Sequence, residues 1–223
     1  MATLRNGIYS GAYYGSEYYE SEPLTVDEMK VNAAYIYTVL GTYFGWTMNS
    51  IAALLGNMQS ESTINPGRWQ SDIVGNTSGG YGLVQWTPAT KYFEWAQHFI
   101  VPDDPSHMDT NLDMINFEVA NGLQWIPTDA YPLSFHEFTV SGDEPEYLAK
   151  AFLLNYERPA DQSESVQNYR AALSRSWYTF LLSGDYPDPG EPDIPSGDKK
   201  KRKTYNFVLF NERRRKQWTN RHF

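Results

Sequence analysis

Apolar residues recur at helical spacing in several segments of this chain, and most of these segments have recognisable ends. Thr25-Val-Asp-Glu28 has the form of a capping box in front of the first segment. Gly41 and Gly45 close that helix, Ser141-Gly-Asp-Glu144 caps a later one, and Gly184 stops the last one. Gly56, inside the second helix, permits close packing. The pattern predicts helices that begin near positions 25, 46, 91, 112, 144 and 163, of which the second ends near Ser60-Glu61 and the last near 182.

The segment 65–90 breaks this helical pattern. It is rich in Gly, Asn, Ser and Pro, and only two short β-like stretches remain in it, 69–74 and 81–86. A small hairpin is the prediction for this region. We therefore expect an α+β fold, mostly helical with one small β element.

Composition divides the chain into four parts. Residues 1–22 are rich in Tyr, Gly and Ser without a helical period, which indicates an irregular arm. A single domain follows over 23–184, then a Pro-rich acidic linker over 185–198 and a basic tail over 199–223. The net charge of −9 conceals this division: residues 1–198 hold 8 Lys+Arg against 26 Asp+Glu, whereas residues 199–223 hold 10 against 1.

Several classes of site are excluded or disfavoured by what the chain lacks. It has no cysteine, which excludes disulfides, thiolate zinc sites and a cysteine nucleophile. The histidines His98, His107, His136 and His222 are scattered and do not form a zinc-ligand pattern, so we expect neither a metal nor another cofactor. No run of eighteen apolar residues and no apolar secretory segment at the N-terminus are present, so we expect a cytoplasmically made protein that does not insert into membranes.

Glu61 lies where an apolar helix ends. A carboxylate at a helix C-terminus faces the negative end of the helix dipole, and cover by Trp69 or Trp86 would further disfavour its charged form. An acid that stays protonated near neutral pH is what cleavage of a glycosidic bond requires. The alternative is an ordinary solvated glutamate after a helix.

Two blocks of the sequence are distinctive, "ALLGNMQSESTINPG" at 53–67 and "GYGLVQWTP" at 80–88. They resemble the lysozyme and lytic transglycosylase superfamily, and most closely the phage tail lysozyme family, within a resemblance that covers about 30–182. The resemblance implies a lysozyme-like fold in which the β-hairpin forms one wall of a cleft. It also implies a tail-associated hydrolase that cleaves the β-1,4 bond between N-acetylmuramic acid and N-acetylglucosamine of peptidoglycan, with Glu61 as general acid.

The second catalytic group is left open by the sequence. Asp72 lies eleven residues after Glu61, where two-carboxylate lysozymes place a carboxylate, but a turn-forming Asp is an equal alternative. Thr77 and Ser78 are a further alternative, as residues that position a water. Lytic transglycosylases use a single Glu and let the 6-hydroxyl of the sugar attack, so hydrolysis and transglycosylation both remain open.

Other residues match positions that line the substrate groove in the superfamily. Gln85 is the strongest of these, as a hydrogen-bonding partner of the sugar or of Glu61. Tyr81 and Trp86 are weaker candidates. Tyr156 lies where relatives carry a cleft Tyr, with a core Tyr as the alternative, and the adjacent Glu157-Arg158 is interpreted as a structural ion pair.

The resemblance also gives expectations about partners and location. We expect the protein in the virion, on the phage tail, with bacterial peptidoglycan as substrate. The tail 199–223 has three functional interpretations, namely nucleic acid, anionic cell wall or an acidic virion protein, beside that of a merely solvated segment. Docking onto other tail proteins is preferred, and the acidic body disfavours nucleic acid. The alternative for the whole chain is an inactive structural tail protein that keeps the lysozyme fold.

Overall fold

The computed structural model describes residues 3–5, 8–10, 23–99 and 108–185. Residues 11–22, most of the linker 185–198 and all of the tail 199–223 lie outside this part, as do His107 and His222. The helices are α1 (Val26–Val39), α2 (Met48–Ser62), α3 (Ala89–Phe99), α4 (Met108–Asn121), α5 (Phe135–Val140), α6 (Pro145–Phe152) and α7 (Glu164–Ser183). None of these helices combines the length and the apolar character needed to cross a bilayer.

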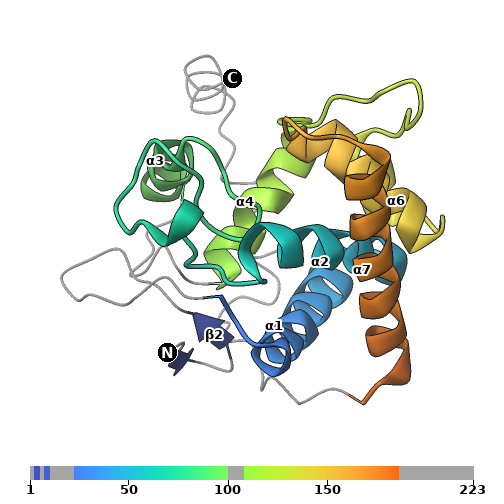
Figure 1. Cartoon of the computed structure of the whole chain (residues 1–223), viewed down its shortest axis with the longest axis horizontal. Coiled ribbons are helices and arrows are strands. Elements are labelled where there is room, and N and C mark those ends of the chain that lie inside the picture. The colour runs from blue at the N-terminus through green and yellow to red at the C-terminus, as the bar shows by residue number, and fades with distance from the viewer. Residues whose placement is uncertain (1–2, 6–7, 11–22, 100–107, 186–223) are drawn as a thin grey trace.

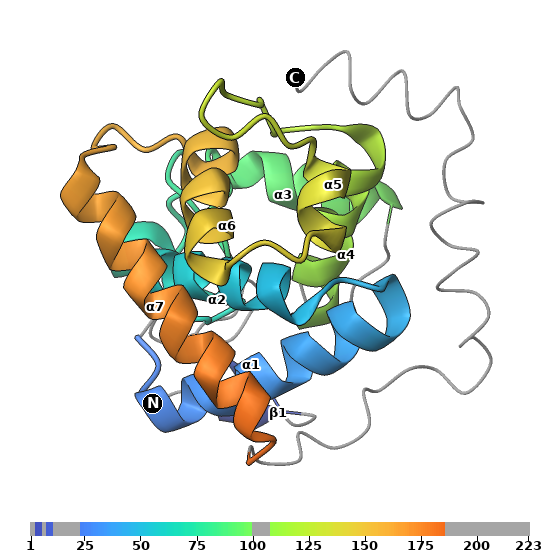
Figure 2. The ribbon, with the colours of Figure 1, turned by 90° about the vertical axis from the view of Figure 1, so that its right-hand side faces the viewer.

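Helix α2 forms the centre of the domain (Figures 1 and 2). Nine of its residues from Ser50 to Met58 are buried in succession, so the helix is surrounded rather than amphipathic. Helix α7 crosses α2 closely at Gly56, where an added Cβ atom would lie 2.7 Å from the backbone nitrogen of Ser174. The sequence interpretation that Gly56 permits close packing is therefore confirmed.

The helix boundaries follow local signals where those signals are strong. Thr25 and Glu28 form both halves of the capping box at α1, as predicted. Gly184 ends α7 in the left-handed conformation with φ 66°. The prediction at 141–144 was wrong in part, because Ser141 ends α5 and α6 begins with Glu144 and Pro145 without a side-chain cap.

Two π-helical turns continue helices at their C-terminal ends. The first is η1 (Leu40–Phe44), which continues α1, and the second is η3 (Leu153–Glu157), which continues α6. Both end in left-handed residues, Gly45 and Arg158. The second turn matters for the site because Glu157 is its last residue.

The expected α+β fold with a β-hairpin wall is wrong. Residues 65–90, all of which are described, contain no strand; they hold the short 3₁₀ turn η2 (Gln70–Asp72) and the isolated bridges Trp69–Tyr81 and Tyr81–Trp86. Positive φ angles at Ser71, Asp72, Gly82 and Gln85 interrupt any extended run. Among the described residues, strands occur at the start of the chain, where β1 (Thr3–Arg5) pairs antiparallel with β2 (Ile8–Ser10).

Aromatic packing holds the 65–90 loop in place of a sheet. Trp69 and Tyr81 are fully buried, and their rings lie 4.8 Å apart between centroids. Tyr81 also packs on Phe93 of α3 at 4.7 Å, and Trp86 stacks on Tyr92 at 4.9 Å. The aromatic side chains of the loop thus enter one cluster with α3, which orders the loop without a ladder of strands.

Candidate active site

Glu61 is the penultimate residue of α2, and its environment is set by how that helix ends. Thr63 and Ile64 both adopt left-handed φ angles of 55°, which turns the chain sharply away from the helix axis. The turn is anchored because Ile64 is fully buried and its carbonyl accepts a 2.9 Å hydrogen bond from the Asn32 side chain of α1. Glu61 is thereby left at the edge of the core with its side chain 21% exposed.

Ser62, the other half of the Glu-Ser pair, ties α2 to the facing loop. Its buried hydroxyl lies 2.9 Å from the carbonyl oxygen of Leu83 and 3.1 Å from that of Met58. The backbone nitrogen of Leu83 in turn donates to the Asn111 side chain of α4 at 3.0 Å. The loop segment 80–86 is therefore fixed relative to Glu61 from both sides.

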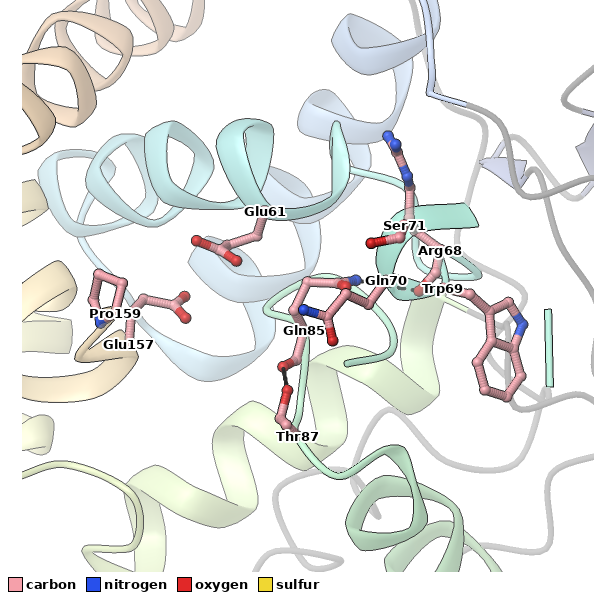
Figure 3. Close-up of a pocket in the computed structure, with 9 residues that line it drawn as sticks. All are labelled: Glu61, Arg68, Trp69, Gln70, Ser71, Gln85, Thr87, Glu157 and Pro159. Carbon is pink, nitrogen blue, oxygen red and sulfur yellow. Dashed lines mark hydrogen bonds between the residues drawn. The ribbon is translucent and has the colours of Figure 1, made fainter. Parts of the chain in front are cut away.

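A cavity of about 270 Å³ opens beside Glu61. Figure 3 shows the residues that line it, which come from the end of α2, the loop around η2, the 80–88 segment and the end of η3. These residues are Glu61, Arg68, Trp69, Gln70, Ser71, Gln85, Thr87, Glu157 and Pro159. Apart from Trp69 and Pro159 they are polar, so the cavity offers hydrogen bonds and charge to a hydrophilic ligand.

Gln85 is the predicted substrate-groove residue that the structure places in the cavity lining. Its side-chain nitrogen donates to the carbonyl oxygens of Gly82 (2.9 Å) and Arg68 (3.2 Å), so its orientation is fixed. Gln70 joins the same two loops, because its backbone nitrogen donates to the Gly80 carbonyl and its side chain accepts from the Gly80 nitrogen. The cavity wall is built from loops that bond to one another.

Tyr81, Trp86 and Tyr156 are not among the residues that line the cavity. All three are at most 3% exposed and lie in the aromatic layers behind it. Trp86 and Tyr156 meet at the carboxylate of Glu118 on α4, to which the Tyr156 hydroxyl donates at 2.5 Å and the Trp86 indole at 3.3 Å. These residues support the cavity and do not form its surface.

Glu118 is fully buried at the centre of this supporting network. Burial raises the pKa of Glu118 to about 7, and the charge of Lys91 together with the bonds from Tyr156 and Trp86 oppose that increase. Burial also lowers the pKa of Lys91, whose ammonium donates to Gln124 at 3.0 Å. Sequence reasoning did not single out Glu118, because a lone glutamate in a helix gives no signal of burial.

Asp72, the predicted second carboxylate, does not line the cavity. It is on η2, its carboxylate is 40% exposed, and it forms a two-point ion pair with Arg68 at 2.9 and 3.2 Å. Thr77 and Ser78 are likewise absent from the lining. The carboxylate that accompanies Glu61 in the cavity is Glu157.

Glu157 and Arg170 are the functional candidates that sequence reasoning missed. The Glu157 Oε1 atom is buried, with no hydrogen-bond partner among the described residues, whereas Arg158 beside it donates to the carbonyls of Gln124 and Asn155. Arg170 of α7 is 6% exposed and forms an ion pair with Glu61. The available signal for Arg170 was its place on the apolar stripe of a helix, where a charged residue is unexpected. It lies four positions after Val166 and three before Leu173.

The comparisons with known proteins agree with the resemblance. The family model for phage tail lysozyme matches residues 31–181, which include every residue of the cavity. The chain is also 47% identical over 164 residues to morphogenesis protein 1 of Bacillus phage B103, an alignment that covers 74% of this chain and 43% of that protein. The chain therefore spans less than half the length of this relative. It belongs to the phage tail lysozyme family.

Proposed function

We propose that this phage tail lysozyme hydrolyses peptidoglycan, cleaving the β-1,4 bond between N-acetylmuramic acid and N-acetylglucosamine with Glu61 as general acid. The observation that carries the proposal is the position of Glu61 at the end of α2, where it lines a polar cavity together with Gln85. A glycan strand is hydrophilic and needs such a cavity, and bond cleavage needs a carboxylic acid beside it.

The proposed reaction begins with transfer of the Glu61 proton to the glycosidic oxygen. The bond between that oxygen and the sugar C1 breaks, and positive charge develops on the ring. Either water or the sugar's own 6-hydroxyl then bonds to C1 and releases a proton. Asp72 remains a candidate to assist this second half, but its carboxylate would have to leave Arg68 in order to do so.

The groups proposed to hold the sugar are the polar side chains of the cavity, with Gln85 first. Its side-chain oxygen can accept a hydrogen bond from an N-acetyl N–H, because both side-chain hydrogen bonds that Gln85 makes within the described part of the chain come from its nitrogen. Tyr81, Trp86 and Tyr156 would act on substrate only through the residues that they support, since they are buried behind the lining.

The biological setting proposed is the phage tail, where the protein would open the host wall for genome delivery. Membership in the phage tail lysozyme family and the likeness to a protein named for morphogenesis support a place in the virion. The tail 199–223 is proposed to dock onto other virion proteins; it lies outside the described residues.

A second candidate is a structural tail protein that keeps the fold without turnover. Two observations favour it: the relative is named for morphogenesis, and the Glu61 carboxylate is already engaged in an ion pair with Arg170. This candidate predicts that the protein does not degrade purified cell wall, whether or not it binds to it.

Mass spectrometry of the sugars released from purified peptidoglycan separates these possibilities. Wild type is compared with Glu61→Gln, Asp72→Asn and, as a matched control, Glu164→Gln, since Glu164 is exposed on α7. Reducing-end products that disappear with Glu61→Gln indicate a muramidase, whereas anhydro-sugars indicate a transglycosylase. An active Glu61→Gln variant, or a wild type that releases nothing, contradicts the proposal.

A further inference from the structure

We propose that Glu157 is a positioning residue that shares one proton with Glu61 across the cavity, so that an acid is available beside Arg170. This inference rests on the proposed function, since it concerns the same reaction. It assigns the second carboxyl group of the cavity to proton supply, a role that neither Asp72 nor Thr77 is placed to fill.

The first argument is geometric. Glu61 and Glu157 reach the cavity from elements almost a hundred residues apart in sequence, α2 and η3, and both line it. Figure 3 shows their carboxyl groups directed toward the same region, opposite the side chains of Gln70 and Gln85. Two carboxyl groups that face one space repel when both are ionised, and the repulsion is relieved when one proton remains on the pair.

The second argument is the incomplete hydrogen bonding of Glu157. Its Oε1 atom is buried and accepts no hydrogen bond from the described residues, although the residue as a whole is only partly buried. An ionised carboxylate oxygen without donors is costly to bury, whereas a protonated carboxyl group tolerates such a position. Burial and, next, the charge of Glu61 hold the pKa of Glu157 well above its ordinary value.

The third argument is the charge balance of the cluster. The Arg170 guanidinium bonds to Glu61 and, through its other terminal nitrogen, to the Asn57 carbonyl at 2.7 Å. One guanidinium compensates one carboxylate, so the two glutamates and Arg170 are neutral when the pair holds a single proton.

The remaining charges around Glu157 do not change this balance. The charge of Arg158 favours ionisation of Glu157 and that of Glu118 on α4 opposes it, so the two act in opposite directions. Arg68, across the cavity, is already paired with Asp72. The cluster that decides where the proton lies is therefore Glu61, Glu157 and Arg170.

The role follows from the chemistry of the acid. Glu61 is ion-paired with Arg170, but it has to carry a proton when the glycosidic oxygen arrives. Transfer of the proton from Glu157 to Glu61 breaks one carboxyl O–H bond and forms the other, and it leaves the negative charge on Glu157. Glu157 acts through Glu61 and needs no contact with the sugar.

The pH profile of wall degradation tests this role. Wild type, Glu157→Gln and the control Glu164→Gln are compared from pH 4 to pH 9. We expect the basic limb of the Glu157→Gln profile to move to lower pH by about one unit, which corresponds to about tenfold lower activity at a given pH on that limb. At acidic pH the activity of Glu157→Gln should be near that of wild type. A purely structural role would lower activity at every pH, so a uniform loss or an unmoved limb overturns the inference.

Carbon-13 NMR of the glutamate carboxyl groups tests proton sharing without any need for activity. The signals of Glu61 and Glu157 are assigned by their loss in Glu61→Gln and Glu157→Gln. We expect the Glu157 signal to titrate above the ordinary glutamate range in wild type and at lower pH in Glu61→Gln. A Glu157 signal that titrates in the ordinary glutamate range, or whose titration is unchanged in Glu61→Gln, contradicts the inference even if the wall is degraded. Correct titrations in a protein without activity would instead contradict the proposed function.

Discussion

The guanidinium of Arg170 on α7 is hydrogen-bonded to the carboxylate of Glu61 at the end of α2, across 109 residues of sequence. The pair joins the two helices that cross at Gly56, and Arg170 also holds the Asn57 carbonyl of the same α2 helix. The candidate acid is therefore fixed by the tertiary contact that organises the core, and changes in that contact should appear in both stability and activity.

Replacement of Arg170 by Met should move the basic limb of the activity profile to higher pH, because the Arg170 charge opposes the raised pKa of Glu157, the proposed proton supply. This direction is opposite to the one expected for Glu157→Gln. We also expect a loss of about 1–2 kcal/mol in the free energy of unfolding, since Glu61 stays partly accessible to water. Urea unfolding and the pH profile measure the two effects.

The matched control for this change is Arg175→Met, on the same helix. Arg175 pairs with Glu144 and Glu146 at the surface, where its side chain is 43% exposed. An exposed pair contributes little, so the pH profile should be unchanged. If both arginine variants shift the profile equally, the effect comes from general charge and not from the pair with Glu61.

Glu118 should make the stability of the protein depend on pH. Burial raises the pKa of Glu118 to about 7 in the folded state, from an ordinary value of 4.5. Below pH 4.5 both states hold the proton. Between pH 4.5 and 7 only the folded state holds it, so the free energy of unfolding falls as pH rises, by up to about 3 kcal/mol, and then levels off.

Glu118→Gln should remove this particular loss, because an amide does not titrate and can still accept from Tyr156 and Trp86. Thermal melts of wild type and Glu118→Gln at several pH values between 4 and 8 measure the difference. Curves that run parallel over this range would show that Glu118 is ionised throughout or that its charge is fully compensated in the fold.

Gly56→Ala should separate α2 from α7. The new Cβ atom would lie 2.7 Å from the Ser174 nitrogen and 3.0 Å from the Arg170 carbonyl oxygen, both of which are backbone atoms that cannot rotate away. We expect a loss of about 1–3 kcal/mol in the free energy of unfolding and reduced activity, because the helix that carries Arg170 is displaced. Gly142→Ala is the control, since no atom lies within 4 Å of its added Cβ; an equal loss there would contradict the packing argument.

Ser62→Ala should loosen the loop that carries Gln85. The change removes the hydroxyl that reaches the Leu83 carbonyl and leaves that buried oxygen without this donor. We expect a loss of about 1 kcal/mol in the free energy of unfolding. In the wall assay we expect a higher KM for the wall substrate and a smaller effect on the maximal rate. Ser176→Ala, at an exposed position of α7, should change neither quantity.

Helix positions and ends were accessible from sequence because their signals are local. The capping box at Thr25 and the stop at Gly184 each depend on a few neighbouring residues, and both are confirmed. The hairpin predicted for 65–90 failed for a reason that is not local. Its apolar residues Trp69, Tyr81 and Trp86 enter one aromatic cluster with α3, and packing of rings replaced pairing of strands.

The sequence by itself determined the family, the α-helices other than α5 and Glu61 as the candidate acid, because motif spacing, caps and helical period are properties of short segments. Only the tertiary structure decided which groups surround that acid. Arg170 and Glu157 come from distant elements, and their ionic and proton-sharing relationships with Glu61 depend on the crossing of α2 with α7 and on the π-helical end of η3. Electrostatic interactions weaken with distance in space and not with separation along the chain. The groups that interact with Glu61 can therefore be identified only from the folded structure.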